Sequence, residues 1–226
     1  MTNIDASGGL PTAPCSLRTP EAIAIRSQLL THPDHVPLRQ WIEQLQESVH
    51  EQGLDIPHFD PIGGGVRARV LYLLEAPGPK AARQHGGSGF ISMDNNDPTA
   101  KNVFTLTQEA GLDRRWVLAW NIVPWYVGTG DKIRPVKLGE VIEGQQHLRE
   151  LISLLPDLRV VVTMGMPARK GWTPLAGLFP QITTLTTWHP SGQSLNPSKS
   201  KRTHVRDTLR LAGELAAYRF DPNGPK

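Results

Sequence analysis

The chain contains 226 residues, of which 38% are hydrophobic and 20% are charged, and its 24 Lys and Arg against 21 Asp and Glu give a net charge of +3. A chain of this length and apolar content can bury a full core, and the slight positive balance is compatible with a polyanionic partner without requiring one. The single cysteine, Cys15, excludes an intramolecular disulfide and any all-cysteine metal or iron–sulfur site within one chain, so we expect neither metal nor cofactor.

No apolar run approaches the roughly 20 residues that span a bilayer, and a lone cysteine is typical of a reducing compartment. We therefore expect a cytoplasmic protein without membrane contact, and a monomer. The Gly, Pro, Ser and Thr content of residues 1–19 predicts a disordered N-terminal segment, and residues 221–226 predict a disordered tail. Residues 20–220 are then expected to form a single domain.

Apolar residues recur at helical spacing in several segments, and these predict helices over 20–30, 38–52, 99–110 and 138–155, from Pro167 onward, and over 202–218. Short apolar or β-branched runs predict strands over 70–74, 116–121, 160–164 and 183–188. The first two helices are expected to cap the sheet, while 84–96 and 124–134 read as loops. Strands that alternate with helices in this way predict an α/β fold, with a parallel sheet covered by helices on both faces.

A polar residue stands at the end of three of the predicted strands: Asn121 is the last residue of one, and Glu75 and His189 directly follow two others. In an open α/β sheet, ligands bind outside the carboxyl ends of the strands, so these side chains are the first candidates for chemistry. Glu75 has the chemistry to activate a water, Asn121 offers a donor and an acceptor together, and His189 can donate to an oxygen on which negative charge develops. Each also has a purely structural alternative, since Glu75 can pair with Arg83, Asn121 can satisfy its own turn, and His189 precedes Pro190 in a rigid turn.

Phe90 lies in a polar, glycine-rich loop, where its ring either stacks on a base or simply anchors the loop. Together these residues could cleave the bond between an extruded nucleobase and its sugar. That reaction needs a group that activates water, an amide that hydrogen-bonds the base, an aromatic ring that stacks on it, and a histidine that donates to its oxygen. The segment 198–210 is rich in Lys, Arg and His, which fits either an edge that faces phosphates or a solvated helix start.

These residues resemble the uracil-DNA glycosylase superfamily in kind, order and separation. The likeness covers residues 70–215 and is carried by Glu75-Ala76-Pro77-Gly78, Gly89-Phe90, Ala110-Gly111-Leu112, Asn121 and His189-Pro190-Ser191. The resemblance implies a three-layer α/β/α sandwich with a central four-stranded parallel sheet, and metal-independent hydrolysis of the N-glycosidic bond in DNA, which leaves an abasic site.

The resemblance also implies roles for individual residues. Glu75 and the Ala76 backbone would lie beside the attacking water, Phe90 would stack on the flipped base, Asn121 would read its amide edge, and His189 would polarise its carbonyl. The loop after Ser191 would press on the DNA, with Gln193 or Leu195 as a candidate wedge. Phosphate contacts are expected from Lys199, Lys201 and Arg202.

The chain departs from the family patterns at several positions. Its first motif is closest to that of the thermophile-type branch, but Leu74 stands where that branch usually has glycine, and Cys15 alone cannot supply its four cluster ligands. In the best-known branch an aspartate stands at the position of Ala76, so the water is held by Glu75 or by another carboxylate such as Asp94 or Asp97. No histidine occurs between Trp125 and Lys137, which argues against covalent trapping of DNA as in one unusual branch.

Two alternative functions remain open at this point. One is a non-catalytic protein that binds damaged DNA or other nucleic acid and has kept the base pocket. The other is a hydrolase of free nucleosides or nucleotides. The main hypothesis is a DNA repair glycosylase acting on uracil or another deaminated base.

Overall fold

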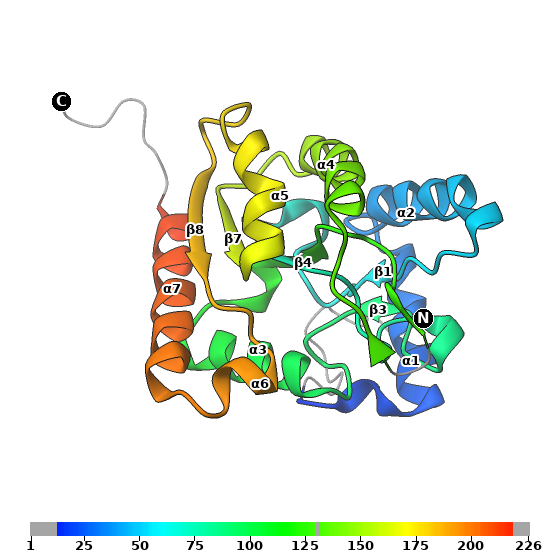
Figure 1. The fold of residues 1–226 in the computed structure, drawn as a ribbon, viewed down its shortest axis with the longest axis horizontal. Helices are drawn as coiled ribbons and strands as arrows, with labels where there is room; N and C mark the ends of the chain where they lie inside the picture. Colours follow the sequence, from blue (N-terminus) through cyan, green and yellow to red (C-terminus); the bar gives the residue numbers. More distant parts are fainter. Residues whose placement is uncertain (1–12, 130–131, 219–226) are drawn as a thin grey trace.

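A four-stranded parallel sheet forms the centre of the computed structural model, which describes residues 13–129 and 132–218 (Figure 1). The strand order is β4 (Val117–Asn121), β2 (Val70–Leu74), β7 (Val160–Met164) and β8 (Thr183–Thr187). All four strands were predicted from the sequence within one residue at either end, because each is a short run of apolar or β-branched residues bounded by turns.

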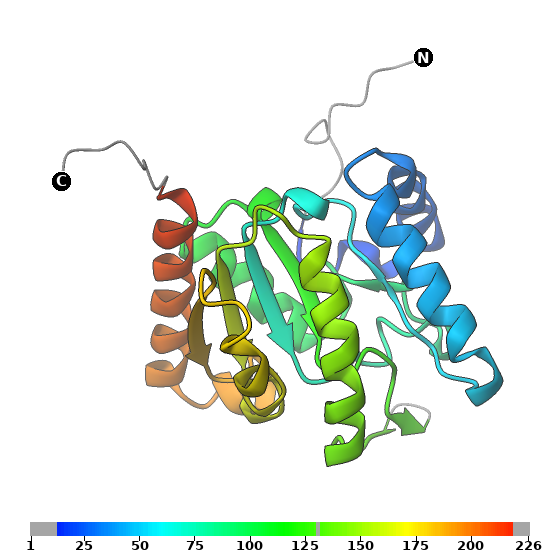
Figure 2. The ribbon, with the colours of Figure 1, turned by 90° about the horizontal axis from the view of Figure 1, so that it is seen from above.

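Helices cover both faces of this sheet (Figures 1 and 2). One face packs against α4 (Leu138–Ser153) and α5 (Met166–Ala176), and the other packs against α3 (Pro98–Glu109) and α7 (Lys199–Ala217). Side chains alternate along the buried strands, so that Leu71 and Leu73 join the first core while Val70 and Tyr72 join the second. The predicted three-layer α/β/α sandwich with a four-stranded parallel sheet is therefore confirmed.

The N-terminal helices α1 (Pro20–Gln28) and α2 (Val36–Ser48) lie beyond the β4 edge of the sheet (Figure 2). Trp41 of α2 packs against Trp120 of β4, with ring centroids 5.4 Å apart, and Phe59 stacks on the same indole at 4.7 Å. The predicted N-terminal cap thus covers the edge of the sheet through an aromatic cluster.

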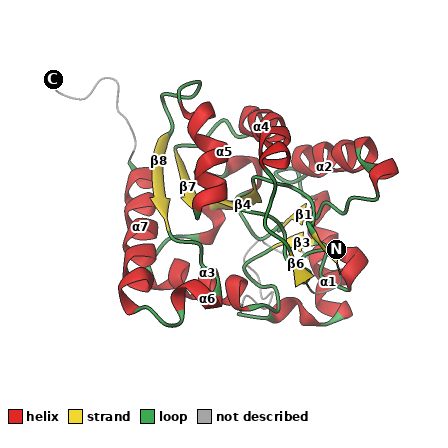
Figure 3. Cartoon of the chain, viewed as in Figure 1, coloured by secondary structure: helices red, strands yellow, loops and turns green. Residues whose placement is uncertain are grey.

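Several short elements escaped the sequence analysis (Figure 3). β1 (His58–Phe59) and β3 (Phe90–Ile91) form a parallel pair, β5 (Gly128–Thr129) and β6 (Lys132–Ile133) form an antiparallel pair, and α6 (Gly192–Leu195) follows the last strand. Short turns of 3-10 helix complete the description: Ser16–Arg18, Leu29–Thr31, His50–Gln52, Gly65–Arg67, Arg83–His85 and Arg114–Trp116. Elements of two to four residues carry too little periodicity to be recognised in a sequence.

The prediction that residues 1–19 are disordered is wrong for the last of these residues. Leu17 lies in a 3-10 turn, is buried, and donates its N–H to the carbonyl oxygen of Asp94 at 3.1 Å. One apolar side chain and one backbone hydrogen bond thus fix the chain before α1 begins. Residues 1–12 and the predicted tail, residues 221–226, lie outside the described residues. Within the described ranges, no helix is both long and apolar enough to cross a membrane.

Candidate active site

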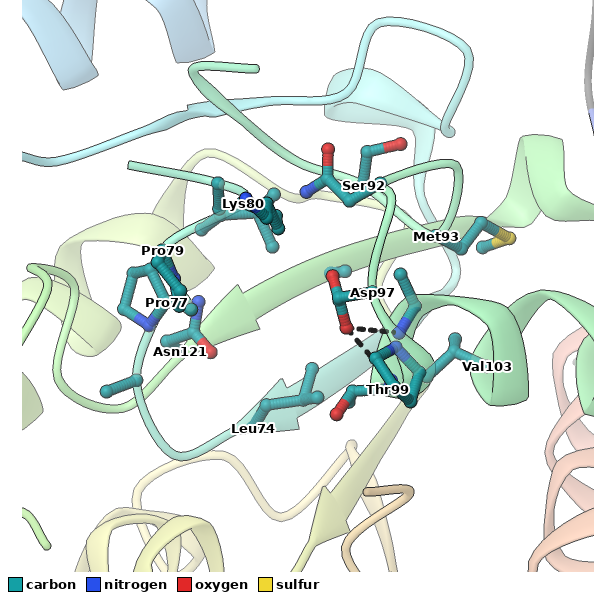
Figure 4. A pocket seen from close by; sticks show the side chains of 18 of the residues that line it. Leu74, Pro77, Pro79, Lys80, Ser92, Met93, Asp97, Thr99, Val103 and Asn121 are labelled. Atoms are coloured by element: carbon teal, nitrogen blue, oxygen red, sulfur yellow. Dashed lines mark hydrogen bonds between the residues drawn. The ribbon is translucent and has the colours of Figure 1, made fainter. Parts of the chain in front are cut away.

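A cavity of about 520 Å³ opens at the carboxyl end of the sheet (Figure 4). The ends of β2 and β4, the loop that enters α3, and the turn after β8 form its walls, and Leu74, Asn121 and His189 all line it. Ala76, Pro77 and Gly78 contribute the wall beyond β2. The structure thus brings together three of the predicted sites, namely Ala76, Asn121 and His189, although they lie far apart in the sequence.

The alternation of side chains along the strands explains which residues face this cavity. Leu74 is the register partner of Asn121, and both point to the face covered by α3 and α7. On β8, Thr187 pairs with Met164 of that same face, and His189 follows two residues later. Because side chains two residues apart in an extended segment share a face, His189 continues toward the cavity.

The same alternation turns the side chain of Glu75 away from the cavity. Glu75 is one residue beyond Leu74, so its side chain turns to the face covered by α4, where Oε1 accepts a hydrogen bond from the backbone N–H of Val136 at 3.4 Å. Glu75 is not among the residues that line the cavity. The prediction that its carboxylate lies beside the attacking water therefore has no support in this geometry, since the carboxylate holds the chain before α4 instead.

Asn121 ends β4 with its side chain in the cavity and only 3% of its surface exposed. Its amide makes no hydrogen bond to any other described residue, although most buried polar side chains are paired. One carbonyl oxygen and one NH₂ group are therefore free to bind a ligand that presents a donor beside an acceptor.

His189 is oriented by the turn that follows it. Its Nδ1 accepts a hydrogen bond from the backbone N–H of Ser191 at 3.2 Å, and burial lowers the pKa of the imidazole below its ordinary value. The neutral ring then carries its proton on Nε2, as a donor. The turn itself is tied to α3, since Asn102 Nδ2 donates to the carbonyl oxygen of Pro190 at 2.9 Å.

The prediction that Phe90 exposes a ring for stacking is wrong. Its side chain is fully buried, with 0% exposure, and it does not line the cavity. Phe90 belongs to β3, which pairs with β1 in a register that places it opposite His58, and its carbonyl oxygen accepts a hydrogen bond from Asn95 Nδ2 at 2.8 Å. The following residues, Ile91 and Met93, face the cavity instead.

Asp94, one of the alternative water-binding carboxylates, is wholly buried in an ion network away from the cavity. The guanidinium of Arg26 contacts Asp60 at 2.6 Å and Asp94 at 2.9 Å, while Arg114 contacts the same two carboxylates at 3.2 and 3.0 Å. Burial would raise the Asp60 pKa, but Arg26 and Arg114 hold it below its ordinary value. With Ser92 donating to Asp60, the network fixes the segment that leads to the cavity wall.

The predicted DNA-facing residues divide into two groups. The prediction that Leu195 presses on the DNA as a wedge is wrong. Its side chain is 2% exposed and belongs to the core between the sheet and the α3–α7 layer. Gln193 is exposed on α6, and Ser191 caps that helix by accepting the N–H of Ser194 at 3.3 Å.

The basic side chains lie on the first turn of α7. Lys199 is exposed, the ammonium of Lys201 lies 4.5 Å from the centre of the Trp188 ring, and Arg202 pairs with Glu109 at 2.8 Å. Trp188 is 49% exposed and directly precedes His189, a signal that the sequence analysis did not use. Ile133 of β6, also overlooked, contributes an exposed apolar side chain to the cavity wall. Its two-residue strand gives no sequence signal.

Comparison with known proteins assigns the family. The family model described as the uracil DNA glycosylase superfamily matches residues 62–212, about two thirds of the chain. The chain belongs to the uracil DNA glycosylase superfamily. The resemblance inferred from the motifs is thus confirmed, and membership places the protein among glycosylase-type hydrolases.

Two solved structures are similar to this superfamily member at low sequence identity. A candidate uracil DNA glycosylase from Methanosarcina acetivorans shares 15% identity with a TM-score of 0.43, over 65% of this chain and 91% of that chain. SMUG2 from Pedobacter heparinus shares 10% identity with a TM-score of 0.46, over 81% of this chain and 85% of that chain. No curated protein is similar enough to match.

Proposed function

We propose that this protein hydrolyses the N-glycosidic bond of uracil, or of another deaminated base, after the nucleotide has been flipped out of DNA. The products are the free base and an abasic site. The observation that carries the proposal is that the unpaired amide of Asn121 and the His189 ring line one cavity at the carboxyl edge of the sheet.

Asn121 has the groups that a deaminated pyrimidine needs. The edge of uracil presents a ring N–H beside a carbonyl oxygen, and the Asn121 amide can accept from the first and donate to the second. A base that offered no partner to the Asn121 amide would leave these buried polar groups unpaired, at a cost in binding.

His189 supplies the electrostatic part of the reaction. The base leaves as an anion, with charge on its carbonyl oxygen, and a neutral imidazole that donates from Nε2 stabilises that charge as it develops. The turn from His189 to Ser191 fixes the direction of this donor through the bond to Nδ1. The Ala76 backbone, on the adjacent wall, is proposed to lie beside the attacking water.

The DNA-binding surface is proposed to surround the mouth of the cavity on the His189 side. Lys199, Lys201 and Arg202 would contact phosphates, while Ser191 and the exposed Gln193 would lie against the strand that carries the vacated position. The charge of these side chains fits the DNA backbone.

The proposal is tested by incubating the purified protein with a duplex or a single-stranded oligonucleotide that carries one uracil. Alkali treatment then cleaves the strand at any abasic site. Strand scission with repeated turnover is expected, and Asn121→Ala or His189→Ala should lower the rate by about 100-fold or more. Hypoxanthine-containing and xanthine-containing oligonucleotides extend the assay to other deaminated bases.

The same assay separates the alternatives. The orientation of Glu75 favours a protein that binds damaged DNA without turnover, and tight, salt-dependent binding with no scission of any substrate would establish that reading. Release of base from free deoxyuridine, unaffected by Lys199→Ala or Lys201→Ala, would instead identify a nucleoside hydrolase.

A further inference from the structure

Glu75, Asp94 and Asp97 are the three carboxylates that could bind the attacking water, and their surroundings in the structure differ. Glu75 bonds the backbone of Val136 on the far face of the sheet, and Asp94 is enclosed by two arginines. Asp97 alone of the three lines the cavity that holds Asn121 and His189. Figure 4 shows Asp97, Leu74 and Asn121 around the same space.

The two oxygens of Asp97 have different surroundings. Oδ1 accepts hydrogen bonds from the backbone N–H groups of Thr99 and Ala100, both at 2.9 Å, and so caps the first turn of α3. No described residue forms a hydrogen bond or an ion pair with Oδ2. The cap fixes the direction of the carboxylate and leaves one oxygen available to a water.

We propose that Asp97 is the catalytic carboxylate of this chain, whose Oδ2 holds and deprotonates the water that attacks the flipped nucleotide. The proposal rests on the function proposed above and assigns to Asp97 the part that the sequence assigned to Glu75. The carboxylate comes from the loop before α3, on the wall of the cavity formed by that helix rather than at the end of β2.

In the step that follows, the water oxygen forms a bond to the sugar carbon C1′ while one water proton passes to Asp97 Oδ2. The bond between C1′ and the base nitrogen breaks, and its electron pair leaves with the base. His189 donates its hydrogen bond to the carbonyl oxygen of that anion. The proton on Asp97 then passes to solvent or to the departing base, which restores the carboxylate.

The surroundings of Asp97 suit a general base. Burial raises its pKa above the ordinary value, while the two N–H groups of α3 and the nearby charge of Lys80 act in the opposite direction. A carboxylate with a raised pKa accepts a proton more readily than a solvent-exposed one. Its negative charge also favours the positive charge that develops on the sugar.

The reaction then has two requirements on the acidic side. Asp97 must be ionised, so the rate falls as the pH drops through the Asp97 pKa, which burial raises. Protonation of His189, whose pKa burial lowers, would break the hydrogen bond from the Ser191 N–H to Nδ1 that orients the ring. Among the residues that line the cavity, Lys80 is the remaining side chain that carries a charge or titrates. Substitution of Asp97 or of His189 should therefore show which part of the fall in rate at low pH each residue causes.

Asp97→Asn is the decisive variant, because asparagine also caps helices and keeps an oxygen for Thr99 and Ala100. The control is Asp113→Asn, away from the cavity, which alters an aspartate that accepts the N–H of Arg115 at the start of a 3-10 turn and also pairs with the exposed Arg115 guanidinium. Single-turnover excision from a uracil-containing oligonucleotide, DNA affinity, thermal unfolding and the pH profile are measured for both, with Glu75→Gln alongside.

We expect Asp97→Asn to lower the single-turnover rate by about 10²- to 10⁴-fold, to keep its affinity and melting temperature, and to lose one acidic limb of the profile. Full activity of Asp97→Asn, or loss of activity in Glu75→Gln alone, would overturn the assignment while leaving the glycosylase function intact. Lack of turnover by the unaltered protein on any deaminated base would overturn both.

Discussion

Gly165, at the end of β7, lies directly against His189. A Cβ atom on Gly165 would be 3.0 Å from the His189 Cβ, and the backbone there has φ +94° and ψ 170°. The strand β7 lies between β2 and β8, so the turn after β8 must pass close to its end for His189 to reach the cavity. The absence of a side chain at residue 165 makes this approach possible.

We expect Gly165→Ala to lower excision and to destabilise the fold. This backbone region is essentially restricted to glycine, and a residue held there costs about 1–3 kcal/mol. The methyl group would also displace the His189 ring, so the excision rate should fall further than the loss of folded protein explains. Single-turnover rates, corrected for the folded fraction by circular dichroism, measure this.

Gly111→Ala separates backbone strain from contact with His189. Gly111 also has a positive φ of +66°, but a Cβ there would meet nothing within 4 Å. This variant should lose stability and keep the single-turnover rate of its folded fraction. If the two variants lose activity to the same degree after correction, the contact with His189 has no part in catalysis.

The buried network of Arg26, Asp60, Asp94 and Arg114 should dominate the stability of the N-terminal half. Arg26→Met leaves two buried carboxylates with a single arginine, and breaking such a network costs about 3–5 kcal/mol. Urea denaturation measures the free energy of unfolding. Arg210→Ala, which removes an exposed pair with Glu214 on α7, serves as the control and should change it little.

The network also predicts an effect on the cavity. Asp94 belongs to the segment that carries Met93 and Asp97, and both of these line the cavity. Arg26→Met should therefore lower excision even under conditions where the chain stays folded. Native stability in urea for Arg26→Met would show that the two arginines are redundant.

The sheet and the family were within reach of the sequence, because both depend on local signals. Apolar runs bounded by Gly and Pro marked the strands, and the polar residues after them located Asn121 and His189 correctly at one cavity. The direction of the Glu75 side chain was also available from the sequence, since one residue beyond Leu74 must face the opposite side of the sheet. Treating all three strand ends as equivalent overlooked that alternation.

The predictions for Phe90 and Leu195 are wrong because their surroundings are not set by the local sequence. Both are large apolar side chains in segments that read as loops, and their burial is decided by partners distant in sequence. The pairing of β3 with β1 encloses Phe90, and the core beneath α7 takes up Leu195. Likewise, nothing local indicates that Asp97 lines the same cavity as Asn121, since an aspartate before Pro98 is fully explained as a helix cap.

The basic turn of α7 should give DNA binding its salt dependence, but its three cations should not contribute equally. Lys199 is exposed, the ammonium of Lys201 lies over the Trp188 ring, and neither forms an ion pair with a described carboxylate, so both can contact phosphates. The guanidinium of Arg202 already pairs with Glu109. We expect Lys199→Ala or Lys201→Ala to reduce the slope of log affinity against log salt by about one unit, and Arg202→Ala to reduce it by less.

Trp188→Ala tests how Lys201 is positioned. Without the ring, the ammonium keeps its charge but loses the surface that orients it, so affinity should fall while the salt slope changes little. Fluorescence anisotropy with a uracil-containing oligonucleotide at several salt concentrations measures both quantities. Lys170→Ala, on α5 across the sheet, is the charge-matched control, and an equal loss of slope in that variant would show that binding responds to net charge rather than to this surface.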